Sequence, residues 1–362
     1  MRVFYYVSQY VSHRLAGLAY IDVLRGLGHE VRANLPPGFD AAAPLAAKTA
    51  RPEELSREQA AFLEDADVVV LHQDPTLYAS MYEAMPALRR KYVIAYAVWE
   101  NEILTPFFIP PLRMVNEVWT CSEFCRAAIA PHVTRCFVLP HLVRKTAPAE
   151  EDFGWAGTLL AESRESGAFV FLSVVDAVNP RKNLRGLLTA FSLLRKGARR
   201  PVRLLLKQYR AKMSFDGMPD VISVAEDVSP GRMAALHVLC GAYVSAHHAE
   251  GWGLGMSEAM AYGKPVVATG YSGNMEYMDA TNSLPVPYAV RPVSEEMRAK
   301  IPLFTPGMMW AEPDTGLFVR AMRDVAEERH APGLRARAAA IVERFGPAGI
   351  GTKLTELLAR AG

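Results

Sequence analysis

Several features that would narrow the function are scarce or missing in this sequence. Its 362 residues include four cysteines, with no CxxC pair and no histidine cluster, so a structural zinc site is not expected. The formal net charge is only +2, so broad attraction to nucleic acid is not indicated and any bound anion must be held locally. No GxGxxG follows an early strand, which disfavours a dinucleotide dehydrogenase.

Long apolar runs are also missing. No stretch is long enough to span a bilayer, and the strand-like start Met1–Val7 is too short and too aromatic for a signal peptide. A cytoplasmic protein is therefore expected. Three of the cysteines lie close enough in sequence for a disulfide, but reduced and mostly buried thiols are the expected state.

Short apolar runs alternate with helical patterns along the whole chain. With 51% hydrophobic and 22% charged residues, this predicts a globular α/β protein of two open, mostly parallel sheets. We predict a first Rossmann-like domain at residues 1–150, a second at 151–340, and a helical segment at 341–362 that packs back on the first. The stretch Arg144–Gly167 reads as a linker. Expected strands are Val3–Val7, Val68–Leu71, Tyr92–Ala97, Val118–Thr120, Phe137–Leu139, Phe169–Val174, Val202–Leu206, Val221–Val224, Tyr243–Ser245 and Pro265–Ala268.

A glycine-rich turn follows one of these strands and leads into a helix. Ligands of open parallel sheets lie beyond the carboxyl ends of the strands, so the loop from Ala249 to Gly255 is where chemistry is expected. Its three glycines let the backbone approach a ligand, and the helix start behind them suits a phosphate. Glu250 and Glu258 flank the turn, and their carboxylates suit vicinal hydroxyls of a sugar or ribose.

Two basic elements lie where a departing diphosphate could be held. Arg181 and Lys182 follow the strand Phe169–Val174 and precede a helix, and Lys207 directly follows the strand Val202–Leu206. Fixed cations can replace a metal ion in stabilising such a leaving group. For the adjacent pair, solvated surface charges are the alternative; for Lys207, at the end of an apolar strand, the functional interpretation is favoured.

These motifs together resemble those of the family 4 retaining glycosyltransferases. The stretches that carry the resemblance are HHAEGWGL from His247, SEAMAYGKPVVAT from Ser257, YSGNMEY from Tyr271, WAEPD from Trp310 and RKN from Arg181. The resemblance implies the GT-B architecture, in which two Rossmann-like domains face each other across a cleft. It also implies that Glu250 binds donor-sugar hydroxyls and Glu258 the nucleotide ribose.

The same resemblance assigns further residues. It implies that Gly251, Trp252, Gly253 and Leu254 contact the donor, and that Arg181, Lys182 and Lys207 share its phosphates. Many relatives carry an arginine where this chain has Asp176, so the division of labour among the three cations stays open.

The first domain offers weaker signals. Gly17 is placed in a loop between the first strand and the first helix, where the family has a phosphate-facing glycine. Glu100 follows a WE element and could reach the reacting centre, although a surface glutamate is an equal alternative. His72 could bond the donor sugar or be a satisfied structural histidine. Acceptor choice is expected to reside in first-domain loops such as Pro36–Arg57.

No metal and no cofactor are expected. The one DxD, Asp65-Ala66-Asp67, is interpreted as a helix end followed by a strand entry. The expected function is therefore metal-independent, retaining transfer of a hexose from a UDP- or GDP-linked donor to a hydroxyl of a carbohydrate or lipid-linked acceptor, in cell-surface polysaccharide or glycoconjugate synthesis. Membrane association is expected to be peripheral at most. The alternatives are a non-catalytic sugar-nucleotide-binding partner of another transferase, and a phosphorylase-like or epimerase-like enzyme of the same fold.

Overall fold

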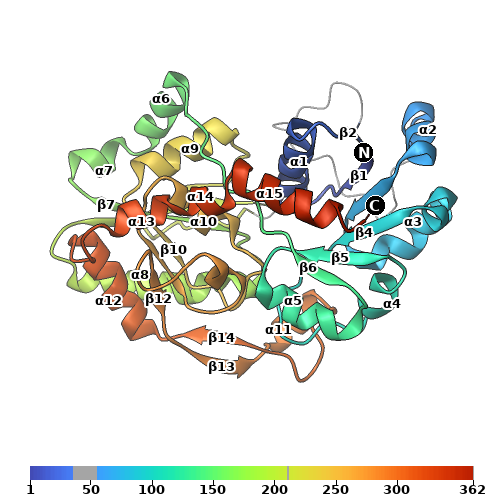
Figure 1. The fold of residues 1–362 in the computed structure, drawn as a ribbon. Helices are drawn as coiled ribbons and strands as arrows, with labels where there is room; N and C mark the ends of the chain where they lie inside the picture. Colours follow the sequence, from blue (N-terminus) through green and yellow to red (C-terminus); the bar gives the residue numbers. More distant parts are fainter. Residues whose placement is uncertain (36–54, 210–211, 362) are drawn as a thin grey trace. The chain divides into compact units, whose positions relative to one another are not determined.

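The computed structural model describes residues 1–35, 55–209 and 212–361 (Figure 1). The chain divides into two compact units. Unit 1 comprises Met1–Leu142 with Glu343–Gly362, and unit 2 comprises Val143–Val342. Most of the segment Pro36–Arg57, in which acceptor contacts are expected, lies outside the described residues.

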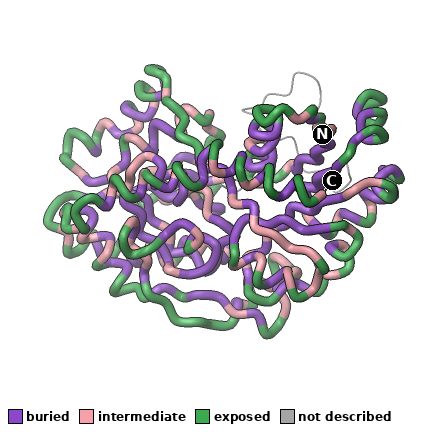
Figure 2. The backbone as a smooth tube through the Cα atoms, viewed as in Figure 1, coloured by how far each residue is buried: buried purple, intermediate pink, exposed green. Residues whose placement is uncertain are grey.

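Unit 1 is built on a six-stranded parallel sheet with the strand order β2-β1-β3-β4-β5-β6. Its central strands are fully buried because apolar residues occupy both faces, as a sheet covered on both sides requires (Figure 2). The strands are β1 Arg2–Val7, β2 Glu30–Ala33, β3 Val68–His72, β4 Tyr92–Tyr96, β5 Glu117–Thr120 and β6 Cys136–Val138. Each expected first-half strand has its counterpart here.

The helices of unit 1 connect and cover these strands. The last one, α15, packs against α1, where Gly351 lies beside Val23 and Leu27. The α-helices are α1 Val11–Gly26, α2 Arg57–Asp65, α3 Tyr78–Ala84, α4 Ile109–Leu112, α5 Glu123–Ile129 and α15 Pro347–Leu358, with α14 Ile341–Phe345 at the boundary of the units. The 3-10 turns are η1 Pro75–Leu77, η2 Pro86–Arg90 and η3 Ala130–His132.

The DxD sequence lies where a helix ends and a strand begins. Asp65 is the last residue of α2, and Asp67 directly precedes β3. The Arg2 backbone N–H donates to Asp67 Oδ2 at 2.7 Å, and the Arg2 guanidinium lies 3.2 Å from Asp65 Oδ2. The interpretation of this motif as a helix end plus a strand entry is confirmed.

Unit 2 repeats the architecture with a second six-stranded parallel sheet, ordered β12-β11-β10-β7-β8-β9, and a separate antiparallel pair, β13 and β14. The strands are β7 Phe169–Val175, β8 Val202–Gln208, β9 Val221–Val224, β10 Ala242–Ser245, β11 Val266–Thr269, β12 Leu284–Val286, β13 Tyr288–Pro292 and β14 Met309–Pro313. The α-helices are α6 Glu150–Leu159, α7 Ala161–Glu165, α8 Leu184–Gly197, α9 Pro230–Leu239, α10 Leu254–Ala261, α11 Glu295–Lys300, α12 Thr315–Ala326 and α13 Leu334–Ala339.

One apolar cluster holds the sheet of unit 2 to two of its helices. Phe171, Leu204 and Val244 come from three adjacent strands, and they pack with Phe191 of α8 and Phe318 of α12. All five side chains are buried, so β10, which leads to the glycine-rich turn, is held in place by a packed core. The expected α/β class with two Rossmann-like domains is confirmed.

The predicted linker Arg144–Gly167 is wrong in one respect, because it contains α6 and α7. Three acidic residues in the first turn of α6 favour a helix start through the helix dipole. Asp152 accepts a hydrogen bond from the Ala149 N–H at 3.0 Å and lies against Gly231 at the start of α9. The stretch is helical because α9 supplies a packing partner, which composition does not reveal.

No helix among the described residues combines the length and the apolarity that crossing a membrane would require.

Candidate functional site

The glycine-rich turn joins the end of β10 to the start of α10 in unit 2. Gly253 is the N-cap of α10 and has φ +88°, a left-handed conformation that strongly favours glycine. A Cβ at this position would lie 2.2 Å from Met256 Cε. At Gly255, a Cβ would lie 2.4 Å from the Tyr243 hydroxyl oxygen, so this glycine lets α10 sit directly against Tyr243. The glycines are needed for the close packing of this turn.

The backbone of Glu250 is fixed by the loop that follows β11. Its N–H donates to Ser272 Oγ at 2.7 Å, and its carbonyl accepts from the Gly273 N–H at 2.9 Å. Ser272 has φ +77°, uncommon for a residue other than glycine. A Cβ at Gly273 would overlap the Gly251 carbonyl oxygen, so the two loops touch backbone to backbone. Glu250 is thus held rigidly at the carboxyl edge of the sheet.

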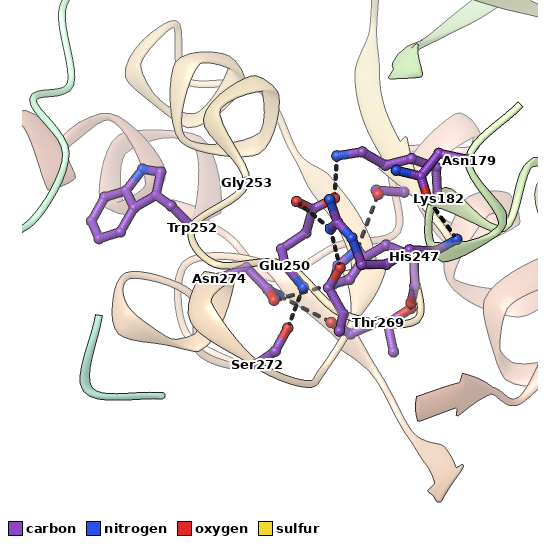
Figure 3. Close-up of polar contacts among 12 residues, drawn as sticks. Asn179, Lys182, His247, Glu250, Trp252, Gly253, Thr269, Ser272 and Asn274 are labelled. Atoms are coloured by element: carbon purple, nitrogen blue, oxygen red, sulfur yellow. Dashed lines mark hydrogen bonds and ion pairs between the residues drawn. The ribbon is translucent and has the colours of Figure 1, made fainter. Parts of the chain in front are cut away.

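The Glu250 carboxylate binds two cations (Figure 3). Its Oε1 lies 2.5 Å from Lys182 Nζ, and its Oε2 lies 3.0 Å from Arg181 Nη1. The side chain of Glu250 is only 8% exposed, and those of Lys182 and Arg181 are 15% and 9% exposed. Burial by itself would raise the pKa of Glu250, but the charges of Lys182 and Arg181 outweigh it and hold this pKa well below its ordinary value. The carboxylate is ionised at neutral pH.

The two cations come from the turn between β7 and α8, and local hydrogen bonds fix its shape. Pro180–Lys182 forms a 3-10 turn, η4, capped by Asn179, whose Oδ1 accepts from the Arg181 N–H at 3.1 Å. Asn183 has φ +48° and caps α8 with its side chain. The His248 N–H donates to the Arg181 carbonyl at 2.8 Å, which ties this turn to the Glu250 loop. Residues that are 68 positions apart in sequence thus meet in one buried cluster.

A buried polar network supports Glu250 from below. His247 Nε2 lies 3.1 Å from Asn274 Oδ1, and its Nδ1 lies 3.0 Å from Ser245 Oγ. Asn274 Nδ2 donates to the Thr269 carbonyl, and the Thr269 hydroxyl donates to the His247 carbonyl. Burial lowers the pKa of His247 to about 4, so the ring is neutral at pH 7. Apart from their place in the motifs of the family resemblance, the sequence predicts no role for these residues. Hydrophobic periodicity predicts strands and helices, but it does not show which side chains of different loops are in contact.

Lys207 lies near the end of β8, pairs with Val174 of β7 and is 6% exposed. Its Nζ donates to the Gln208 carbonyl at 2.6 Å. Burial lowers the pKa of Lys207, while Asp227 and Glu226 act in the opposite direction. Lys207 therefore occupies the predicted edge of the sheet, but within the described part of the chain no ion pair joins it to Glu250.

The remaining residues of the turn divide into two groups. Glu258 lies on α10 with its side chain 40% exposed. Trp252, by contrast, is buried and points away from the Glu250 cluster (Figure 3). Its indole N–H donates to Ser257 Oγ at 3.0 Å, and its ring packs on Tyr277. The Trp252 side chain therefore stabilises the turn, and Leu254 is the first residue of α10.

The expected loop position of Gly17 in unit 1 is wrong, because Gly17 lies inside α1. The helix begins at Val11, and Gly17 is buried against the sheet. A Cβ there would lie 3.3 Å from His72 Nδ1 and 3.4 Å from Tyr5. The glycine provides close helix–sheet packing, and its backbone N–H belongs to a helix rather than to a phosphate-facing loop.

His72 and Glu100 lie at the carboxyl ends of two neighbouring strands of unit 1. His72 ends β3 and is completely buried, with Nδ1 3.0 Å from the Tyr5 hydroxyl. Burial lowers its pKa well below the ordinary value, with the nearby His13 and His141 adding to the effect. Glu100 lies beyond the end of β4 and is partly exposed. These positions are at the carboxyl edge of the sheet, where the sequence places them.

Among the described residues, no group of three or more His, Cys, Asp or Glu side chains is arranged to hold a metal ion.

With this geometry in view, comparison with known proteins defines the class. Residues 161–284, about a third of the chain, match the family described as "Glycosyl transferases group 1". The matched segment contains Arg181, Lys182, Lys207, Glu250 and Glu258. This segment of the chain is therefore similar to a glycosyltransferase domain, and the chain as a whole has the fold of two Rossmann-like domains found in the GT-B class. No curated protein sequence gives a significant match.

Solved structures of similar fold include a sucrose-phosphate synthase from Thermosynechococcus elongatus, with a TM-score of 0.65, 15% identity and 99% of each chain covered. An alpha,alpha-trehalose 6-phosphate synthase from Burkholderia multivorans gives a TM-score of 0.62 at 10% identity, again with 99% of each chain covered. The pneumococcal O-GlcNAc transferase GtfA, in complex with UDP and GlcNAc, gives 0.57 at 12% identity; 83% of this chain matches 59% of that one. At these identities the likeness concerns the fold.

Proposed function

We propose that this chain is a retaining glycosyltransferase of family 4, which transfers a hexose from a UDP- or GDP-linked donor to a hydroxyl acceptor without a metal ion. The observation that carries the proposal is the buried carboxylate of Glu250, which lies in the glycine-rich turn of the matched segment. This carboxylate is bonded to Lys182 and Arg181 of the turn between β7 and α8. The complex of a similar transferase with UDP and GlcNAc supports a UDP-linked donor.

Charge within the cluster favours a diphosphate. Glu250 contributes one negative charge, and Lys182 and Arg181 contribute two positive charges, so a single positive charge remains. Lys207 adds another cation at the same edge of the sheet. Lys182 uses one of its three N–H donors on Glu250, which leaves donors for phosphate oxygens. Fixed cations in a buried site stabilise a leaving diphosphate without reorganisation.

The two glutamates are assigned to the hydroxyls of the donor. Glu250, fixed through its backbone and its ion pairs, keeps lone pairs for sugar hydroxyls. Glu258, which is partly exposed on α10, receives the ribose hydroxyls. The assignment of Glu250 to the sugar and of Glu258 to the ribose follows the family resemblance. The rigid backbone of Glu250 supports its part of this assignment.

In the proposed step, the acceptor oxygen attacks the anomeric carbon on the face from which the diphosphate leaves. The carbon–phosphate oxygen bond breaks, the new glycosidic bond forms, and a phosphate oxygen of the leaving group takes the acceptor proton. The protein contributes positioning and charge stabilisation, so no side chain is assigned as a catalytic base.

For the acceptor side, Glu100 and His72 remain the proposed contacts with acceptor or sugar. We propose a carbohydrate or lipid-linked carbohydrate acceptor in cell-surface polysaccharide or glycoconjugate synthesis, a cytoplasmic location, and contact with a membrane that is peripheral at most.

A donor panel tests this function. The purified chain is incubated with UDP- and GDP-hexoses in EDTA, and release of the nucleoside diphosphate is followed with and without sugar acceptors. Transfer or slow donor hydrolysis that survives EDTA, with an anomeric proton signal showing retention, is expected. Nucleotide binding without release of diphosphate would favour the non-catalytic partner, and inversion or strict dependence on Mg²⁺ would overturn the proposal.

A further inference from the structure

His237, on α9, is an unusual buried residue of unit 2. It is 2% exposed, and neither of its ring nitrogens has a hydrogen-bond partner among the described residues. Buried polar groups are nearly always bonded, and a buried imidazole with two unpartnered nitrogens lowers stability, so such a group calls for an explanation. Packing alone would be served as well by phenylalanine.

Two tyrosine rings hold the imidazole in a fixed orientation. The Tyr262 ring is nearly parallel to it, with centroids 5.6 Å apart and an interplanar angle of 9°, and the Tyr243 ring lies at 6.1 Å and 24°. Both tyrosines are themselves anchored, because the Tyr243 hydroxyl accepts from the Val174 N–H and the Tyr262 hydroxyl donates to the Thr146 carbonyl. The His237 ring therefore has little freedom to turn toward another partner.

The atom that His237 faces belongs to the proposed donor site. Its Nε2 lies 3.5 Å from Oε2 of Glu258, just beyond an ordinary hydrogen bond. The Glu258 side chain is 40% exposed, so its carboxylate has room for the small rotation that would close the gap. The imidazole is buried and the carboxylate is not, which makes the ring the fixed member of the pair.

We propose that His237 is a positioning residue for Glu258. With its hydrogen on Nε2, the imidazole donates to Oε2 of Glu258 and orients the carboxylate so that Oε1 receives a ribose hydroxyl. Pre-orienting a flexible side chain raises affinity because less freedom is lost when the ligand binds. This inference rests on the proposed function and deepens it, because it makes His237 a determinant of ribonucleotide recognition without contact with the nucleotide.

Nucleotide binding to the full chain tests the inference. The ligands are UDP or GDP, whichever wild type binds, and the matching 2′,3′-dideoxy nucleotide, which lacks both ribose hydroxyls. His237→Phe keeps an aromatic ring at this position but removes the N–H group that donates the hydrogen bond to Glu258. We expect about a tenfold loss of affinity for the ribonucleotide, and less than a twofold loss for the dideoxy nucleotide. The thermal stability of this variant should be equal to that of wild type or higher.

His237→Gln places an amide N–H near the position of Nε2 and should recover most of the ribonucleotide affinity. His237→Asn is the matched control, since its shorter amide cannot reach Glu258 and should behave like His237→Phe. The double variant His237→Phe/Glu258→Ala should bind the ribonucleotide with the same affinity as Glu258→Ala alone, because His237 acts only through Glu258.

The outcomes separate the two proposals. Equal losses for both nucleotides, or an unchanged affinity in His237→Phe, would overturn the role of His237 while leaving the proposed function standing. Failure of wild type to bind any of these nucleotides would overturn both. A Glu258→Ala variant with normal ribonucleotide affinity would remove the ribose assignment and with it this inference.

Discussion

Replacing Glu250 by glutamine would leave Arg181 and Lys182 buried beside a neutral amide. Breaking a buried ion pair by removing one partner costs about 3–5 kcal/mol, because the remaining charges stay desolvated. All three side chains are at most 15% exposed, so little solvent screening reduces this cost. We expect Glu250→Gln to lower the free energy of unfolding at pH 7 by this amount, measured by urea denaturation.

The pH dependence of this loss has a definite sign. The pKa of Glu250 is depressed in the folded protein, so its stabilising effect is present above the ordinary value of 4.5 and is lost as pH falls. Burial and Arg181 lower the pKa of Lys182, but the charge of Glu250 acts in the opposite direction and the pKa is raised in wild type. Glu250→Gln removes this opposing charge, so we expect the deficit to shrink as pH rises toward the ordinary lysine value of 10.5. The difference in stability between wild type and variant should therefore be largest near neutral pH.

A second substitution separates stability from function. Lys182→Met together with Glu250→Gln removes one of the two uncompensated cations, and we expect it to restore about half of the lost stability. Turnover should not recover in the double variant, because it lacks both the carboxylate that binds the sugar hydroxyls and the ammonium group that binds phosphate. For Glu250→Gln alone, we expect turnover to fall by about 10- to 100-fold, which corresponds to the loss of one charged hydrogen bond. A Glu250→Gln protein as stable as wild type at pH 7 would refute the buried cluster.

Three further predictions concern other parts of the chain. Lys207→Met should lower turnover by about 10²- to 10³-fold, as expected for a lost charge-stabilising donor, and leave the urea midpoint nearly unchanged; normal turnover would exclude Lys207 from phosphate binding. Gly253→Ala should cost more stability and donor affinity than Gly307→Ala. Both glycines have φ near +90°, so each substitution carries the cost of a left-handed backbone conformation, about 1–2 kcal/mol. Of these two positions, only Gly253 has neighbouring atoms that an added Cβ would meet. Equal effects of the two substitutions would therefore argue against a close-packed turn. Burial lowers the pKa of His141 to about 3, so wild type should lose stability as pH falls from about 6.5 toward 3. His141→Asn retains a polar group near the Tyr20 and Tyr96 hydroxyls and should lose less stability over this range, as measured by urea denaturation. The same dependence of unfolding free energy on pH in both proteins would contradict a neutral, buried His141.

The sequence predicts the two sheets well because buried parallel strands are nearly continuous apolar runs. It also places Glu250, Arg181 and Lys182 in loops at the carboxyl ends of strands, as observed. The contact between Glu250 and the two cations is a tertiary event across 68 residues, and no local pattern reports it. The same limit hides the packing of α6 on α9, which turns a predicted linker into a helix.

One error in the sequence-based prediction has a physical cause. Gly17 looks like a loop glycine, but it lies in a helix that must approach His72 and Tyr5 closely. The contact of Trp252 with the donor stays a prediction, and the structure adds that its indole is buried against Tyr277. Packing in three dimensions explains both features, and spacing along the chain does not encode it.

Isothermal titration of the full chain with UDP and GDP, in buffer containing EDTA, is the decisive test of a donor site built on fixed cations. We expect saturable binding of one of the two nucleotides without metal, weakened by Lys182→Met and by Glu258→Ala. Binding that appears only when Mg²⁺ is restored, or that is unchanged in both variants, would contradict a site in which fixed cations and the two glutamates hold the donor.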